Sequence, residues 1–379
     1  METKGTGMTV NTVDVSAGRA QQVLREGWAA QRAGALTTSW MLHGRPGVGK
    51  TEIVRQLAAE QGARFYDLRL TTIESQDLRG LPYYDHETKK TQWYRPEDLP
   101  DDPDRPSLLF LDELTAAPPH LHPAVYGLLL ERRVGPHILP DNVFLVAAGN
   151  MVEDGAVAYE MGTALSDRLI HLQVRATASD WLESYAVPRT LHPAVLAFIR
   201  MRPDLLETTA EALDRGLMIS TTPRSWDRVS RIMGAVQDRA LRRIMVAGTV
   251  GEAVAAEFML VADDIEASVS VERLLNAAPH ERIMLYPESM HGLHALIYGL
   301  VGALGPTTAV PVIDVMAGIR TLDVHRSDAS FARMPLAELC THGFEMAIRR
   351  GLEQGLAEDF LGHPAYAAYA SERQAMGLE

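Results

Sequence analysis

The sequence has one cysteine among 379 residues, which excludes a disulfide-stabilised scaffold and a structural zinc site built from cysteines. It also lacks a long apolar run, since the longest, at residues 295–304, is about half of what a membrane span requires. The first residues do not show the basic-then-apolar layout of a signal peptide. These absences predict a soluble protein that is not inserted in a membrane and resides in the cytoplasm.

Basic residues are in the minority, with 36 Lys and Arg against 49 Asp and Glu and a net charge of −13. This balance disfavours nucleic acid as the main partner, because its recognition depends on Lys and Arg at the phosphates. Hydrophobic residues nevertheless make up 46% of the chain, which is enough for a folded core. A chain of this length is expected to form two or three domains.

Strand-like and helix-like segments alternate in the first half of the chain. Short apolar runs lie at residues 40–43, 63–70, 107–114, 143–149 and 169–174, with helical patterns such as 51–61 and 122–132 between them. This alternation predicts an α/β fold with a parallel five-stranded sheet covered on both faces. Beyond residue 176 the patterns are helical. We therefore predict three domains: an α/β core at 1–176, a helical domain at 177–268 and a helical C-terminal module at 269–379.

A glycine-rich motif follows the first of these strands. It fits the pattern G-x-x-x-x-G-K-[ST] at every fixed position, and its residues are Gly44, Arg45, Pro46, Gly47, Val48, Gly49, Lys50 and Thr51. The glycines would let backbone N–H groups face phosphate oxygens, while Lys50 would reach the β- and γ-phosphates and the Thr51 hydroxyl would bind Mg²⁺. This P-loop predicts a nucleotide-binding core that uses ATP and Mg²⁺.

Two further strands end in polar residues. The run Ser-Leu-Leu-Phe-Leu delivers Asp112 and Glu113 at the carboxyl end of a strand, where ligands bind in open parallel sheets. Asp112 would hold Mg²⁺ and Glu113 would act as general base on the attacking water. The next apolar run ends at Asn150, which could orient water near the γ-phosphate. Taken alone, this residue is more typical of a turn, but its position after the acidic strand favours the role at the phosphate.

Together these motifs resemble those of the AAA+ ATPases, over about residues 20–265. By this resemblance Arg168, in the segment Ala-Leu-Ser-Asp-Arg-Leu, would be an arginine finger that reaches the nucleotide of a neighbouring subunit. Arg224, in Thr-Pro-Arg-Ser-Trp, would be the sensor 2 arginine on a helix of the lid, which is the domain at 177–268. The alternative interpretations are a structural Asp-Arg pair for Arg168 and a surface arginine for Arg224.

Within the superfamily the sequence is most similar to the MoxR-like ATPases. The similar segments are residues 75–82, residues 246–252 and residues 129–140. The last of these looks like the hairpin that this clade inserts into its second helix. The resemblance implies a ring, typically a hexamer, whose ATP hydrolysis remodels or activates a protein client or a metal-containing complex. It also implies a partner with a von Willebrand A-type domain. The module at 269–379 carries no recognisable motif.

Two other functions stay open at this point. One is an AAA+ motor that acts on nucleic acid, such as a helicase or restriction ATPase, although the sequence contains no basic domain. The other is a nucleotide-gated structural or switch protein that hydrolyses ATP slowly. The intact pair Asp112 and Glu113, together with Arg168, favours an active ATPase over an inactive one.

Overall fold

The computed structural model describes residues 11–150, 163–326 and 330–375. The chain divides into two compact units. The first, which we call the core unit, comprises Met1–Thr177 with Thr209–Met218 and Thr222–Arg224. The second, the helical unit, comprises Ala178–Thr208, Ile219–Thr221 and Ser225–Glu379. The division into three domains stays a prediction.

The core unit is built on a parallel sheet, which confirms the predicted α/β fold. In the described residues the sheet has six strands in the order β1-β10-β2-β9-β6-β3. Their bounds are β1 Asp14–Val15, β2 Ser39–His43, β3 Arg64–Arg69, β6 Ser107–Asp112, β9 Val143–Gly149 and β10 Leu169–Val174. The prediction of five strands missed β1, whose two residues pair with Gln173 and Val174 of β10 and are too few to show a sequence pattern.

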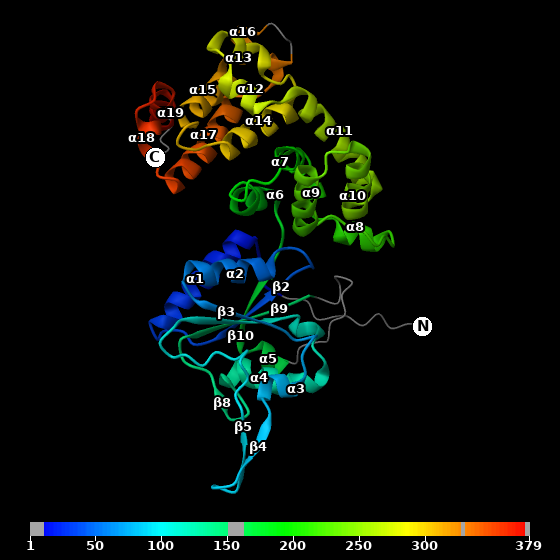
Figure 1. Ribbon diagram of the computed structural model, residues 1–379, viewed down its shortest axis with the longest axis vertical. Helices are drawn as coiled ribbons and strands as arrows, with labels where there is room; N and C mark the ends of the chain where they lie inside the picture. The colour runs from blue at the N-terminus through cyan, green and yellow to red at the C-terminus, as the bar shows by residue number, and fades with distance from the viewer. Residues whose placement is uncertain (1–10, 151–162, 327–329, 376–379) are drawn as a thin grey trace. The chain divides into compact units, whose positions relative to one another are not determined.

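Helices cover both faces of the sheet, because the strands alternate apolar side chains between them (Figure 1). Phe110 and Phe144 are fully buried on the face covered by α1 (Ala17–Arg32) and α2 (Lys50–Glu60). Leu109 and Leu145, one residue away along each strand, are fully buried on the face covered by α4 (His122–Glu131). The helices α3 (Ser75–Arg79) and α5 (Thr163–Ser166) lie on the α4 side. The central strands β2, β6 and β9 are therefore buried on both sides, which accounts for the continuous apolar sequences of β6 and β9.

Two kinds of hairpin interrupt the core unit. Strands β7 (Arg133–Val134) and β8 (His137–Ile138) pair in the segment that resembles an inserted hairpin, directly after α4. A longer hairpin, β4 (Pro82–Asp85) with β5 (Lys90–Trp93), lies between β3 and β6 and extends away from the sheet (Figure 1). The sequence analysis did not anticipate this longer hairpin, because its strands are polar and exposed and show no apolar alternation.

The helical unit contains helices around an aromatic and aliphatic core. Phe198 lies 5.4 Å, centroid to centroid, from both Trp226 and Phe258. Leu296 and Ile297 are fully buried on the longest apolar segment of the sequence, which forms a helix of the interior and not a membrane span. The helices are α6 Ala178–Trp181, α7 Pro193–Met201, α9 Pro223–Ala235, α10 Arg239–Val250, α11 Glu252–Ser268, α12 Val271–Asn276, α13 Pro279–Leu285, α14 Met290–Gly302, α15 Ala309–Gly318, α16 Leu322–His325, α17 Leu336–Glu353, α18 Ala357–Leu361 and α19 Pro364–Ala375. The remaining α-helix of the described residues, α8 (Thr209–Asp214), belongs to the core unit.

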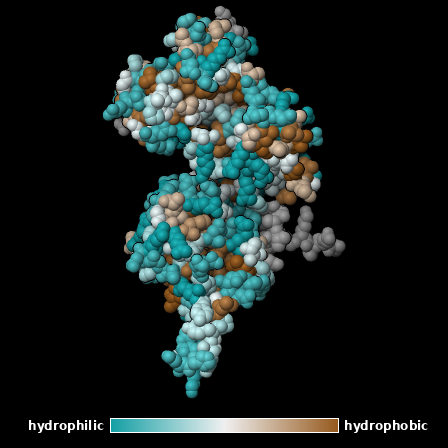
Figure 2. Space-filling view, in the orientation of Figure 1, coloured by the Kyte–Doolittle hydropathy of each residue, from teal (hydrophilic) through white to brown (hydrophobic). Residues whose placement is uncertain are grey.

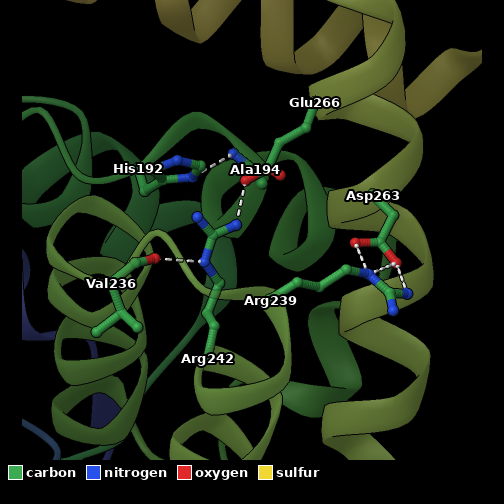
Figure 3. A network of polar contacts seen from close by, with 7 residues as sticks. All are labelled: His192, Ala194, Val236, Arg239, Arg242, Asp263 and Glu266. Carbon is green, nitrogen blue, oxygen red and sulfur yellow. Dashed lines mark hydrogen bonds and ion pairs between the residues drawn. The ribbon is translucent and has the colours of Figure 1, made fainter.

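A polar network ties α10 to α11 (Figure 3). The Arg242 side chain is 6% exposed; its Nε donates to the Val236 carbonyl at 2.9 Å, and its Nη1 donates to Glu266. Arg239 Nε contacts both carboxylate oxygens of Asp263 at 3.0 and 3.1 Å. Because a buried guanidinium is costly without partners, these contacts fix the pairing of the two helices.

The surface of the helical unit includes an apolar strip on α10, where Leu241, Ile244 and Met245 are exposed and Figure 2 shows hydrophobic side chains. Scattered apolar residues are common on protein surfaces. In the part of the chain that the structure describes, no helix has the length and apolar character that a membrane crossing would need.

Candidate functional site

The glycine-rich motif forms the turn between β2 and α2. β2 ends at His43, α2 begins at Lys50, and Gly47 and Gly49 have φ angles of 84° and 103°, a region that favours glycine. The first N–H groups of α2 therefore point out of the helix end at the carboxyl edge of the sheet. This is the geometry in which a helix N-terminus receives an anion such as phosphate.

Lys50 is largely buried at this turn. Its ammonium group donates to the carbonyl oxygens of Gly44 and Arg45, the latter at 3.1 Å, and to Asn150 Oδ1 at 2.8 Å. Asn150 follows β9, which is the neighbour of β2 in the sheet. The structure thus brings together the lysine of the phosphate loop and the asparagine that the sequence analysis singled out. Both can face a phosphate bound at the loop.

Thr51 and Asp112 form an oxygen pair beside Lys50. The Thr51 hydroxyl donates to Asp112 Oδ2 at 3.2 Å, and Asp112 Oδ1 accepts from the backbone N–H of Glu113 at 2.9 Å. Asp112 is 8% exposed. Hydroxyl and carboxylate oxygens are ligands that Mg²⁺ prefers, and Mg²⁺ commonly takes its other ligands from water and phosphate. These two residues fit the predicted metal role, although among the described residues no group of three or more His, Cys, Asp and Glu could hold a metal.

Glu113 turns away from the strand in a left-handed conformation, with φ 59° and ψ 35°. Its carboxylate accepts from the Thr71 hydroxyl and lies 3.8 Å from Arg69 Nε. The side chain is 37% exposed. It is therefore open to water, as a general base needs to be, and is held by residues at the end of β3. The sequence analysis did not single out Thr71 or Arg69.

Thr115 is a further residue that the sequence analysis missed. Its Oγ1 accepts from the Asn150 N–H at 3.0 Å and donates to the Asn150 carbonyl at 2.8 Å. Both bonds hold the backbone of Asn150 in place, so that the side-chain amide can reach Lys50. The only sequence signal is the position of Thr115 three residues after Asp112, and a single threonine in a turn carries little information.

Arg224 lies beside the phosphate loop. Its backbone N–H donates to the Gly47 carbonyl at 3.3 Å, and its side chain is exposed in the first turn of α9. The structure thus brings this residue to the site although it lies far along the chain from the glycine motif.

Arg168 lies at the other end of the sheet. It directly precedes β10, and in the parallel pairing Leu169 is opposite Ser39, whereas Gln173 is opposite His43 at the phosphate loop. Five residues of strand span about 16 Å. The Arg168 N–H donates to the Leu165 carbonyl at 3.1 Å, its carbonyl accepts from the Thr38 hydroxyl at 3.3 Å, and the residue is exposed. The structure does not bring Arg168 to the phosphate loop of its own chain.

Burial affects a titratable group next to the loop. His43 directly precedes Gly44 and is buried, and this burial, then the proximity of His171 and Lys50, lowers its pKa to about 3. The ring is therefore neutral at physiological pH. A neutral His43 adds no positive charge to the phosphate loop, where Lys50 supplies it.

Residues 39–169 match the family model of the AAA domain of the dynein-related subfamily. The chain contains an AAA domain. Such a domain implies nucleotide-hydrolysing activity in general. The matched range begins with β2, ends at the start of β10, and includes the P-loop, Asp112, Glu113, Asn150 and Arg168. Arg224 lies beyond it.

The chain is also similar to solved structures. The RuvB Holliday junction branch migration motor of Thermotoga maritima is 16% identical, with 71% of this chain and 80% of that chain covered and a TM-score of 0.33. A candidate ATPase from Cytophaga hutchinsonii is 14% identical, with 87% and 79% covered and a TM-score of 0.31. No curated protein sequence matches the chain.

Proposed function

We propose that the AAA domain hydrolyses ATP with Mg²⁺ at the carboxyl end of its sheet. The observation that carries this proposal is that residues at the ends of three neighbouring strands meet in two pairs, Lys50 with Asn150 at 2.8 Å and Thr51 with Asp112 at 3.2 Å. The P-loop amides and Lys50 would hold the phosphates, and Thr51 and Asp112 would hold Mg²⁺. Bound Mg²⁺ would neutralise developing charge on the phosphoryl oxygens.

Two residues would prepare the attacking water. Glu113 would remove its proton, because its carboxylate is at the strand end and open to solvent. Asn150 would orient the water through its amide, whose oxygen is already fixed by Lys50. Arg224 would contact the γ-phosphate from the same chain, which its backbone bond to Gly47 supports.

We further propose that Arg168 serves the nucleotide of a neighbouring copy in a ring, typically a hexamer. Its position at the amino end of β10, about 16 Å of strand away from the phosphate loop, supports a role outside its own site. An arginine that compensates charge in the transition state is worth roughly 10³ to 10⁵ in rate. Assembly would then be a requirement for rapid hydrolysis.

The wider role that we propose is the remodelling or activation of a protein client or metal-containing complex by a MoxR-like ATPase, with a von Willebrand A-type partner. The sequence resemblance supports it. The net charge of −13 favours a protein client over a polyanion.

The experiment that tests the site combines two defective variants. Subunits with Arg168→Ala keep their own hydrolytic site, whereas subunits with Glu113→Gln keep the finger. Mixed rings should therefore hydrolyse ATP faster than either variant alone. The control mixes Lys50→Ala subunits with Glu113→Gln subunits. The Lys50→Ala site should not bind nucleotide, so an intact arginine finger from the neighbour should not restore its activity. If mixed rings form and no ratio restores activity, the proposed role of Arg168 in a neighbouring site is wrong.

A further inference from the structure

Two histidine side chains in the core unit link the phosphate loop to the segment that carries Arg168. His43 is the last residue of β2, and its Nε2 lies 2.8 Å from His171 Nδ1 on the adjacent strand β10. The two ring planes differ by 15°. The other nitrogen of His171, Nε2, lies 2.8 Å from the Ser166 carbonyl and 3.2 Å from the Ser166 hydroxyl. Ser166 ends α5 and precedes Arg168 by two residues.

The hydrogen-bond partners fix the direction of this chain. The Ser166 carbonyl can only accept, so His171 Nε2 must carry a proton and donate it. In an imidazole with one N–H, Nδ1 of His171 is then an acceptor and must receive its hydrogen bond from His43 Nε2. His43 is held neutral by its burial, and its buried Nδ1 has no hydrogen-bond partner among the residues that the structure describes. As a lone pair and not an N–H, this atom is in the less costly of its two forms.

Two contacts with described residues hold the backbone of the turn around Arg168. The Arg168 side chain projects from an exposed turn between α5 and β10, and its backbone is held by Leu165 and Thr38. The His171 bond to Ser166 adds the link that joins this turn to the interior of the sheet. A reactive group must be held within a fraction of an ångström, and a displacement of about 1 Å can cost about 100-fold in rate.

We propose that His171 is a positioning residue for Arg168, and that His43 holds His171 in the tautomer that this role requires. This inference rests on the proposed function, because Arg168 must act on ATP in a neighbouring subunit for its position to matter. It goes beyond that function by assigning to the buried His43 and the half-buried His171 the orientation of the finger that a subunit presents to its neighbour. It also links that orientation to the residue directly before the subunit's own P-loop.

The test uses His171→Phe, which keeps a planar ring but has no hydrogen-bonding nitrogen, and His171→Gln, whose amide can donate from the position of Nε2. The His171→Phe variant should lower kcat by about 10- to 100-fold while the Kd for ATP stays within about twofold. The His171→Gln variant should recover most of the rate. His137→Phe is the matched control, because it removes another partly buried bond from a histidine to a backbone carbonyl, that of Arg79 at 3.0 Å, and should leave kcat near the parental value.

Mixed rings distinguish a role in positioning Arg168 from a merely structural one. Subunits with Glu113→Gln should rescue subunits with His171→Phe, as they rescue subunits with Arg168→Ala. In the mixed ring, the intact nucleotide site of the His171→Phe subunit lies next to the correctly placed Arg168 of a Glu113→Gln subunit. Loss of the rate without rescue, while Arg168→Ala is rescued, would show that His171 acts within its own subunit and would overturn the proposal. A parental rate for His171→Phe would also overturn it. If Arg168→Ala itself is fully active, the proposed role of the finger fails instead.

A double variant tests the part played by His43. In a chain of two bonds, His43→Phe combined with His171→Phe should be no slower than His171→Phe alone, because the link is already broken. Losses that multiply would show that the two histidines act independently and would refute their coupling. Thermal unfolding of each variant identifies any that fail to fold, and His171→Gln keeps the test decisive if His171→Phe is one of them.

Discussion

Replacement of Thr115 by valine should both destabilise the core unit and slow ATP hydrolysis. Valine has the shape of threonine but no hydroxyl, so the variant loses the bond from the Asn150 N–H at 3.0 Å and the bond to the Asn150 carbonyl at 2.8 Å. Thr115 is 6% exposed, and its side chain lies against Gly149. Because the site is closely packed, water has little room to replace the missing hydroxyl.

The magnitude follows from the two lost bonds. An unsatisfied polar group in the interior costs about 1–3 kcal/mol, so the backbone N–H and carbonyl of Asn150 together give about 2–6 kcal/mol. For a folding unit of this size, each kcal/mol lowers Tm by about 2–4 °C, so a decrease of roughly 4–24 °C is expected. Asn150 would also lose its fixed position beside Lys50, which should lower kcat by about tenfold or more.

Calorimetry and a steady-state ATPase assay measure these two effects. Thr115→Ser is the matched control, since it keeps the hydroxyl and should stay close to the parent in kcat. A Thr115→Val variant with parental Tm and parental kcat would refute the role that we assign to this hydroxyl. A loss of stability without a loss of kcat would show that Asn150 does not depend on it.

Three further predictions concern buried polar groups. The pKa of His43 is about 3 in the folded state and 6.5 in the unfolded state, so between these pH values only the unfolded state gains the proton. The free energy of unfolding should therefore fall by about 1.4 kcal/mol per pH unit between pH 6.5 and 3. Denaturation measured against pH should show that His43→Phe removes this part of the pH dependence. Glu266→Gln should lower the unfolding free energy by only about 1 kcal/mol, because the Glu266 side chain is 45% exposed although Arg242 is buried. A much larger loss in a urea titration would contradict this small contribution of the ion pair. Burial raises the pKa of Cys340 to about 11, so the thiol should react with a disulfide reagent at pH 8 only after unfolding, and rapid labelling of the native protein would contradict its placement.

The sequence predicted the parts of the AAA domain that depend on local patterns. Strands buried on both faces are continuous apolar runs, so β6 and β9 could be located without the structure. The phosphate loop could be identified because glycine, lysine and threonine must have a fixed spacing to surround a phosphate. Asp112 and Asn150 then follow from the rule that parallel strands end at the same edge.

Contacts between distant segments could not be predicted in this way. The bond between Asn150 and Thr115 and the pair formed by His43 and His171 depend on strand order and register, which no local pattern records. Strand β1 and the hairpin β4–β5 were not predicted, for another reason. Their residues are few, polar or exposed, so no apolar alternation marks them.

The most direct test of the account compares the parent protein with Glu113→Gln in the same preparation. We expect the parent to release phosphate from ATP in the presence of Mg²⁺. The Glu113→Gln variant should bind ATP with a Kd within a few-fold of the parent and release phosphate at least 100-fold more slowly, which is within the range for loss of a general base. Equal rates of phosphate release at equal ATP occupancy would contradict the assignment of Glu113, and no hydrolysis by the assembled parent would contradict the proposed function itself.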